Sequence, residues 1–119
     1  MATLLVLFRT PQDVEAFDRH YLEVHLPLAR RMPGLRSIRV DRAVGGDPAL
    51  REYHLVARLE FASREEMRTA LGSPEGMAAG NDLAQFAVDG YKMLQLEPLE
   101  PLEGSGAAGV GEGIGDGRG

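Results

Sequence analysis

The stretch LLVLF, from Leu4 to Phe8, is an unbroken apolar run of strand length. A run without polar alternation is typical of a strand that is buried on both faces. Five residues are too few for a helix, and Thr10-Pro11 ends the pattern. The sequence therefore predicts a first strand over residues 3–9 that needs cover on both sides.

A helix is predicted over residues 13–31. Asp13 suits its first turn, because an acidic side chain there caps free backbone N–H groups and favours the helix dipole. Apolar side chains recur at helical spacing and make one stripe. The stripe consists of Val14, Phe17, Tyr21, Val24, Leu28 and Met32. Pro27 removes one backbone donor, so we expect a break or kink near His25–Leu26.

Two alternating stretches, residues 35–44 and 51–61, predict the next two strands. In the second stretch one face carries Tyr53, Leu55, Ala57, Leu59 and Phe61, and the other carries Glu52, His54, Val56, Arg58 and Glu60. Ser63 and Glu66 form a capping box that begins a second helical region. This region pauses at Gly72 and restarts at Ser73-Pro74. A last strand is predicted over residues 88–96, with a bulge at Gly90.

The order of these elements is strand, helix, strand, strand, helix, strand. This order predicts an α+β, ferredoxin-like βαββαβ sandwich with a four-stranded antiparallel sheet and helices on one face. The first and third strands would lie in the middle. Because the helices cover only one face, the run Leu4–Phe8 needs a second copy against the other face. We therefore expect a homodimer that forms a dimeric α+β barrel.

Composition limits what this chain can do. Its 119 residues include no cysteine, which excludes disulfides, zinc–thiolate sites and thiol nucleophiles. The net charge of −5 argues against a nucleic-acid partner. No apolar run is long enough for a membrane span and no signal peptide is evident, so we expect a cytoplasmic protein without a membrane partner. Eight of the 15 glycines fall between Gly104 and Gly119. We expect a domain over 1–98, an extended arm over 99–103 and a flexible Gly-rich tail over 104–119.

His25 is the first candidate for chemistry, because it falls at the edge of the apolar stripe beside the break made by Pro27. An imidazole there could act as a general acid or base, with Tyr21 as a nearby hydrogen-bond donor. A structural His25 that binds a freed carbonyl is the alternative. His20 is about 140° from His25 at 100° per residue, so the two cannot bind one metal ion as an i, i+4 pair would. We expect His20 to be partly exposed.

Three further residues are candidates for ligand binding. His54 shares its predicted strand face with Arg58 and could line a polar pocket or a dimer interface. Tyr91 could donate a phenolic hydrogen bond. Arg39 could pair with a carboxylate, although a solvated arginine on an edge strand also fits.

The segment FDRHYLEVHLPL, residues 17–28, followed by the Pro33-Gly34 step, resembles the EthD family, named for ethyl tert-butyl ether degradation. The segment SPEG, residues 73–76, is also familiar from that family. The resemblance covers about residues 3–98 and implies a dimeric α+β barrel. Related barrels include cofactor-free monooxygenases, muconolactone isomerases, polyketide cyclases and haem-degrading enzymes. Only His25 and the Pro27 step carry over as motif positions.

Two functions follow from these expectations. The first is a cofactor-free enzyme or catabolic accessory that acts on a small hydrophobic, oxygenated compound with His25 as acid/base. The second is a non-catalytic dimeric module that binds a hydrophobic metabolite or assists a partner enzyme. Haem binding through a histidine, as in some relatives, is a third possibility. A cavity that touches His25 would favour the first.

Overall fold

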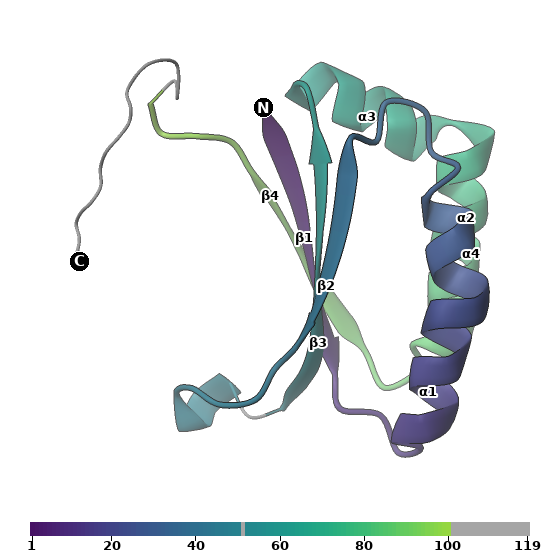
Figure 1. The fold of residues 1–119 in the computed structure, drawn as a ribbon, viewed down its shortest axis with the longest axis vertical. Coiled ribbons are helices and arrows are strands. Elements are labelled where there is room, and N and C mark those ends of the chain that lie inside the picture. Colours follow the sequence, from purple (N-terminus) through teal and green to yellow (C-terminus); the bar gives the residue numbers. More distant parts are fainter. Residues whose placement is uncertain (51, 101–119) are drawn as a thin grey trace.

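The computed structural model describes residues 1–50 and 52–100 and has a four-stranded antiparallel sheet with helices on one face (Figure 1). The strands are β1 (Ala2–Arg9), β2 (Ser37–Arg42), β3 (Tyr53–Phe61) and β4 (Tyr91–Leu96). The helical segments are α1 (Val14–His20), the π-helical η1 (Tyr21–His25), α2 (Leu26–Ala29), the 3-10 turn η2 (Pro48–Leu50), α3 (Arg64–Gly72) and α4 (Pro74–Phe86). This order confirms the ferredoxin-like α+β sandwich. The predicted tail over 104–119 and residues 101–103 of the predicted arm lie outside the described residues.

The strand order β2-β3-β1-β4 places β1 and β3 in the middle, as predicted. Leu4 pairs with Leu59 of β3, and Leu5 pairs with Leu94 of β4. Alternate residues of β1 from Ala2 to Phe8 are buried under the helices, whereas those from Thr3 to Arg9 on the open face are half-buried. The described residues therefore leave the second face of the central strand incompletely covered.

Side-chain caps fix where the helices begin. The Asp13 carboxylate accepts a hydrogen bond from the backbone N–H of Ala16 at 3.1 Å. The hydroxyl of Ser63 accepts one from Glu66 N–H at 3.1 Å, which is the serine half of the predicted capping box. Ser73 caps α4 in the same way. These caps satisfy backbone donors that have no partner inside the helix.

Glycine is required where α3 meets α4. A Cβ on Gly76 would collide with the carbonyl oxygen of Ala70, so the two helices can approach this closely only without a side chain there. Gly90 has φ of +109° and lies in the turn before β4. The last strand therefore begins at Tyr91, and the predicted start at residue 88 with a bulge at Gly90 was wrong.

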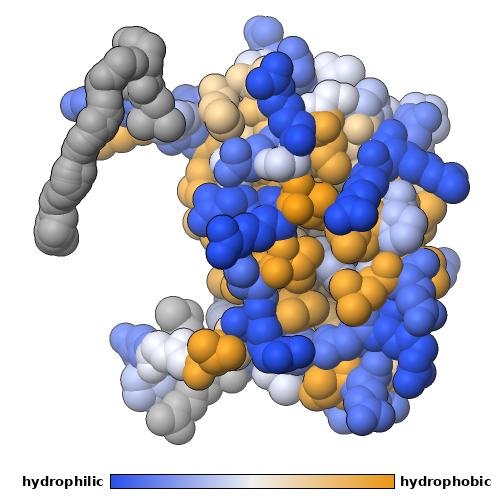
Figure 2. Space-filling model, viewed as in Figure 1, coloured by the Kyte–Doolittle hydropathy of each residue, from blue (hydrophilic) through white to orange (hydrophobic). Residues whose placement is uncertain are grey.

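Charged and apolar side chains are intermixed along the edge of the molecule that Figure 2 presents, with apolar groups between the sheet and the helices. In residues 1–50 and 52–100, no helix is both long and apolar enough to cross a membrane.

Candidate functional site

A π turn in the first helical region positions the two histidines. The backbone N–H of Leu26 bonds to the carbonyl of Tyr21, five residues earlier, and the flanking residues keep helical dihedral angles. The helix therefore continues through the point where Pro27 predicted a break. Such turns are rare in proteins, and those that do occur are often found at functional sites.

The π turn also changes which residues are buried. Buried positions follow a spacing of four, at Phe17, Tyr21, His25 and Ala29. Val14 and Val24 of the predicted stripe are exposed. The prediction failed because it assumed 100° per residue, and one wider turn rotates the later residues relative to the earlier ones. His25 consequently takes the buried place that was predicted for Val24.

Asp82 of α4 joins the two histidines. Its Oδ2 lies 3.0 Å from Nδ1 of His25, and its Oδ1 lies 2.9 Å from Nε2 of His20. An ionised carboxylate can only accept hydrogen bonds, so both ring nitrogens that face Asp82 carry protons. In neutral His25 the other nitrogen, Nε2, is then an unprotonated acceptor. A carboxylate that fixes the tautomer and orientation of an imidazole in this way is a common support for a general base.

His25 is buried, with 8% of its surface exposed. Burial lowers the pKa of His25 below its ordinary value of 6.5, and hydrogen bonding to Asp82 opposes that change. The direction is physically reasonable, since a buried imidazolium loses hydration that one carboxylate only partly replaces. His25 is therefore neutral at pH 7 and able to accept a proton at Nε2.

Tyr21 lies next to His25, with ring centroids 5.3 Å apart. It is 1% exposed, and within the described residues its hydroxyl has no hydrogen-bond partner. Burial raises the pKa of Tyr21 to about 12, against a smaller opposing effect of Arg30. The phenol thus stays protonated at neutral pH. A buried hydroxyl without a partner is unusual, and a ligand oxygen would satisfy it.

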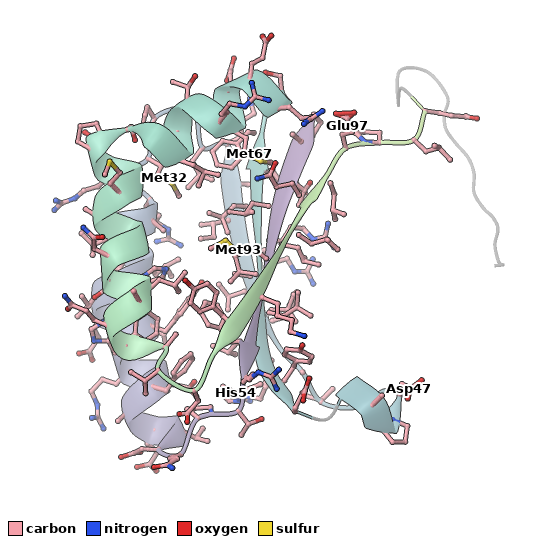
Figure 3. The ribbon with its side chains drawn as sticks, turned by 180° about the vertical axis from the view of Figure 1, so that it is seen from behind. Met32, Asp47, His54, Met67, Met93 and Glu97 are labelled. Atoms are coloured by element: carbon pink, nitrogen blue, oxygen red, sulfur yellow. The ribbon has the colours of Figure 1, made fainter. Side chains whose placement is uncertain are left out.

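Tyr21 and His25 line one cavity between the sheet and the helices, with a volume of about 60 Å³. The rest of its lining is almost wholly apolar, including Leu4, Phe8 and Leu83. Met93 also lines the cavity and is 47% exposed, so it lies where the cavity approaches the surface. Figure 3 shows Met93 pointing from β4 into the space between the two layers. The cavity therefore combines apolar walls with two residues that carry polar groups, Tyr21 and His25.

His54 lies outside this cavity, at the end of the sheet where β3 begins (Figure 3). Its Nε2 is 2.7 Å from Oδ1 of Asp18, and its ring packs edge-on against Phe17. The sequence predicted that His54 and Arg58 lie on the same face of this strand. That prediction was wrong because β3 has a bulge. Phe8 pairs with Leu55 and Arg9 pairs with Tyr53, so His54 has no partner on β1 and turns toward the helices.

The same bulge moves Tyr53 to the open face, where the Arg9 guanidinium lies 5.8 Å from its ring centre. Tyr91 packs against Phe8 at 6.3 Å and is not among the cavity residues. Arg39 is exposed on β2, and its Nε donates to the Asp41 carboxylate at 3.2 Å. The structure thus brings together Tyr21 and His25, but not Arg39, His54 or Tyr91.

Sequence reasoning missed Asp82. One signal was available, because Asp82 falls between Ala79 and Phe86 at helical spacing and so interrupts the inward face of α4 with a charge.

In residues 1–50 and 52–100, no group of three or more His, Asp or Glu side chains is arranged to hold a metal ion.

The fold is that of a ferredoxin-like α+β protein, and Tyr21 and His25 line the cavity between its two layers. The EthD domain family matches residues 9–90, and the chain belongs to that family. It is 33% identical over 94 residues to an uncharacterized 11.0 kDa protein from the thcB-thcC intergenic region of Rhodococcus erythropolis, covering 79% of this chain and 91% of that one.

Solved structures agree with this assignment. An EthD family protein from Bacillus halodurans is 34% identical, with a TM-score of 0.77 over 83% of this chain and 99% of that one. SnoaB, a cofactor-independent oxygenase from Streptomyces nogalater, is 15% identical, with a TM-score of 0.63 over 86% of this chain and 96% of that one. The likeness to SnoaB shows a shared fold.

Proposed function

We propose that this EthD-family protein is a cofactor-free enzyme or catabolic accessory that acts on a small, uncharged, oxygen-bearing apolar compound. His25 is its acid/base and Tyr21 its hydrogen-bond donor. One observation carries the proposal: an imidazole nitrogen and a phenolic hydroxyl, both without protein partners among the described residues, belong to neighbouring rings that line one buried apolar cavity.

The chemistry that these groups support is proton transfer. Nε2 of His25 takes a proton from an O–H group, or from a C–H group next to a carbonyl, and becomes part of an imidazolium. The Asp82 carboxylate, 3.0 Å from Nδ1, stabilises that positive charge. The Tyr21 hydroxyl donates to the oxygen on which negative charge develops. The same proton can return from His25 to another atom of the compound, which would complete an isomerisation or cyclisation.

The lining of the cavity favours an uncharged compound. Among the described residues that line it there is no Lys, Arg, Asp or Glu side chain, and His25 is neutral at pH 7. Burying an anion there without a partner would cost several kcal/mol. The cavity of about 60 Å³ is smaller than a phenol ring needs, so a bound compound would extend toward the opening at Met93. SnoaB, which shares the fold, is described as a cofactor-independent oxygenase, so the fold accommodates chemistry without a cofactor.

The open face of the sheet supports a homodimer in the form of an α+β barrel. Leu5 of β1 pairs with Leu94 of β4 on this face, and Leu94 is 55% exposed. The β2–β3 connection and residues 97–100 both project on this side of the sheet (Figure 1). Two structural neighbours are described as dimeric ferredoxin-like proteins. A second copy on this face would cover the exposed leucines.

The functional test uses phenol as a neutral probe and benzoate as its charged counterpart. Calorimetry should detect phenol binding to the wild-type protein and no benzoate binding. A panel of small ketones, enols and phenols, followed by mass spectrometry, should contain a compound that the wild type converts and His25→Gln does not. His54→Gln is the matched control and should retain the conversion.

Two results would contradict the proposal. Conversion that survives in His25→Gln removes that residue from the mechanism. Binding of phenol without conversion of any compound supports the non-catalytic binding module instead.

The dimer is tested by two leucine substitutions. Leu94→Glu on the open face should give a monomer in sedimentation analysis. Leu22→Glu is the control, because Leu22 is similarly exposed, at 60%, on the helical side. A wild-type monomer at micromolar concentration would overturn the dimer.

A further inference from the structure

His20 lies on the outer side of the histidine pair. Its side chain is 34% exposed and lines a separate surface groove that also includes Pro11, Phe17 and Val88. The His20 ring stacks on Phe86 at 4.5 Å, and the His25 ring packs against Phe86 at 5.1 Å. Phe86 therefore contacts both imidazoles, one at a groove open to solvent and one at the buried cavity.

The imidazole rings of His20 and His25 share one hydrogen-bond partner, the carboxylate of Asp82. Both oxygens of Asp82 lie within 3.1 Å of Nε2 of His20, and Oδ2 also lies 3.0 Å from Nδ1 of His25. The Asp82 side chain is only 12% exposed, so water offers it little alternative hydrogen bonding. A single negative charge compensates one imidazolium well and two poorly.

We propose that His20 and His25 form a coupled pair, in which His20 holds Asp82 in place and sets the proton affinity of His25 from the outer groove. His20 is thus a positioning residue for the reaction proposed above. This role in catalysis rests on that proposed function. When His20 is neutral, Asp82 is free to stabilise an imidazolium at His25. When His20 takes up a proton at Nδ1, its charge competes for Asp82 and makes His25 a weaker base.

The surroundings of the two imidazole rings differ in charge. Asp13 and Asp89 lie with His20 around the outer groove, and Asp82 faces His20 from α4. Of the described residues that line the cavity around His25, Tyr21 is the one further titratable side chain. Acidic side chains therefore surround the outer ring, whereas the inner ring faces apolar groups. Solvent reaches His20 at the groove, and Asp82 is the contact through which a charge on His20 would act on His25.

NMR titration of the three histidine rings tests the coupling in the full chain, and it requires no substrate. His20→Gln keeps a donor near Asp82 but cannot take a proton. In this variant the His25 titration should move to higher pH and become a single step. Asp82→Asn should move the His25 titration to lower pH. Arg19→Gln, which removes an exposed positive charge from the adjacent position, should change neither.

A His25 titration that is the same in wild type and His20→Gln overturns the coupling, provided that the amide spectrum of the variant is that of a folded protein. If His20→Gln does not fold, the Asp82→Asn variant tests the coupling instead. An unchanged His25 titration in Asp82→Asn also overturns the coupling. Coupling that is present when no compound is converted would leave this inference standing and contradict only the proposed function.

Discussion

Nδ1 of His25 lies 3.0 Å from Oδ2 of Asp82, and this contact joins a π turn to a helix 57 residues further along the chain. The contact fixes which nitrogen of His25 carries the proton and directs the basic nitrogen away from Asp82. Because His25 also lines a buried cavity with Tyr21, the geometry turns an otherwise ordinary core histidine into a candidate base.

Tyr21→Phe should change the free energy of unfolding and the affinity for phenol in opposite directions. The substitution keeps the ring in the core and removes a buried hydroxyl that has no partner in the described part of the chain. We expect the free energy of unfolding to rise by about 1 kcal/mol, because an unsatisfied buried group carries a desolvation cost. Phenol binding should weaken about tenfold, equivalent to the loss of one hydrogen bond.

Tyr91→Phe is the control for that experiment, because Tyr91 lies outside the cavity lining. It should leave phenol binding unchanged in calorimetry. Equal effects of the two substitutions on phenol binding would argue against a role for the Tyr21 hydroxyl.

The stability of the protein should depend on pH through His25. Burial lowers the pKa of folded His25 below 6.5, so the unfolded chain takes up its proton at higher pH than the folded chain. This contribution destabilises the fold as pH falls below 6.5, and the loss levels off below the folded pKa.

Urea unfolding at about pH 8 and about pH 5 measures this effect. The wild type should lose more free energy of unfolding between these conditions than His25→Gln. An equal loss in both proteins would show that His25 titrates alike in the folded and unfolded chains.

Two glycines of α4 should respond to alanine in opposite directions. A Cβ on Gly80 meets no atom within 4 Å, so Gly80→Ala should stabilise the helix by about 0.5–1 kcal/mol. A Cβ on Gly76 collides with the backbone of Ala70 and Leu71, so Gly76→Ala should destabilise the protein by more than about 1 kcal/mol. Thermal unfolding distinguishes the two, and a stabilising Gly76→Ala would mean that α3 and α4 can separate without cost.

The fold was predictable because its signals are local. Alternation along residues 53–61, the unbroken run at Leu4–Phe8 and the capping serines each mark an element without knowledge of the others. Together they specify the element order, and the order specifies the strand arrangement.

The site was only half predictable. Tyr21 and His25 could be named as candidates because they fall on or beside one helical stripe. Asp82 was missed because its partners are distant in sequence, and a lone acid in a helix is usually solvated. His54 was placed on the wrong face because a bulge reverses the alternation on which the prediction depended. The π turn was missed for the same kind of reason, since one extra residue per turn leaves no local mark except Pro27.

In the proposed mechanism, His25 presents an unprotonated Nε2 to a ligand in the cavity. Nitrogen-15 NMR of the histidine rings at neutral pH measures this directly, with phenol added as the probe. We predict a neutral His25 with its proton on Nδ1, and a phenol-dependent shift of His25 Nε2 that His54 does not share. A His25 that carries a proton on Nε2, or that does not respond to phenol, would contradict the account.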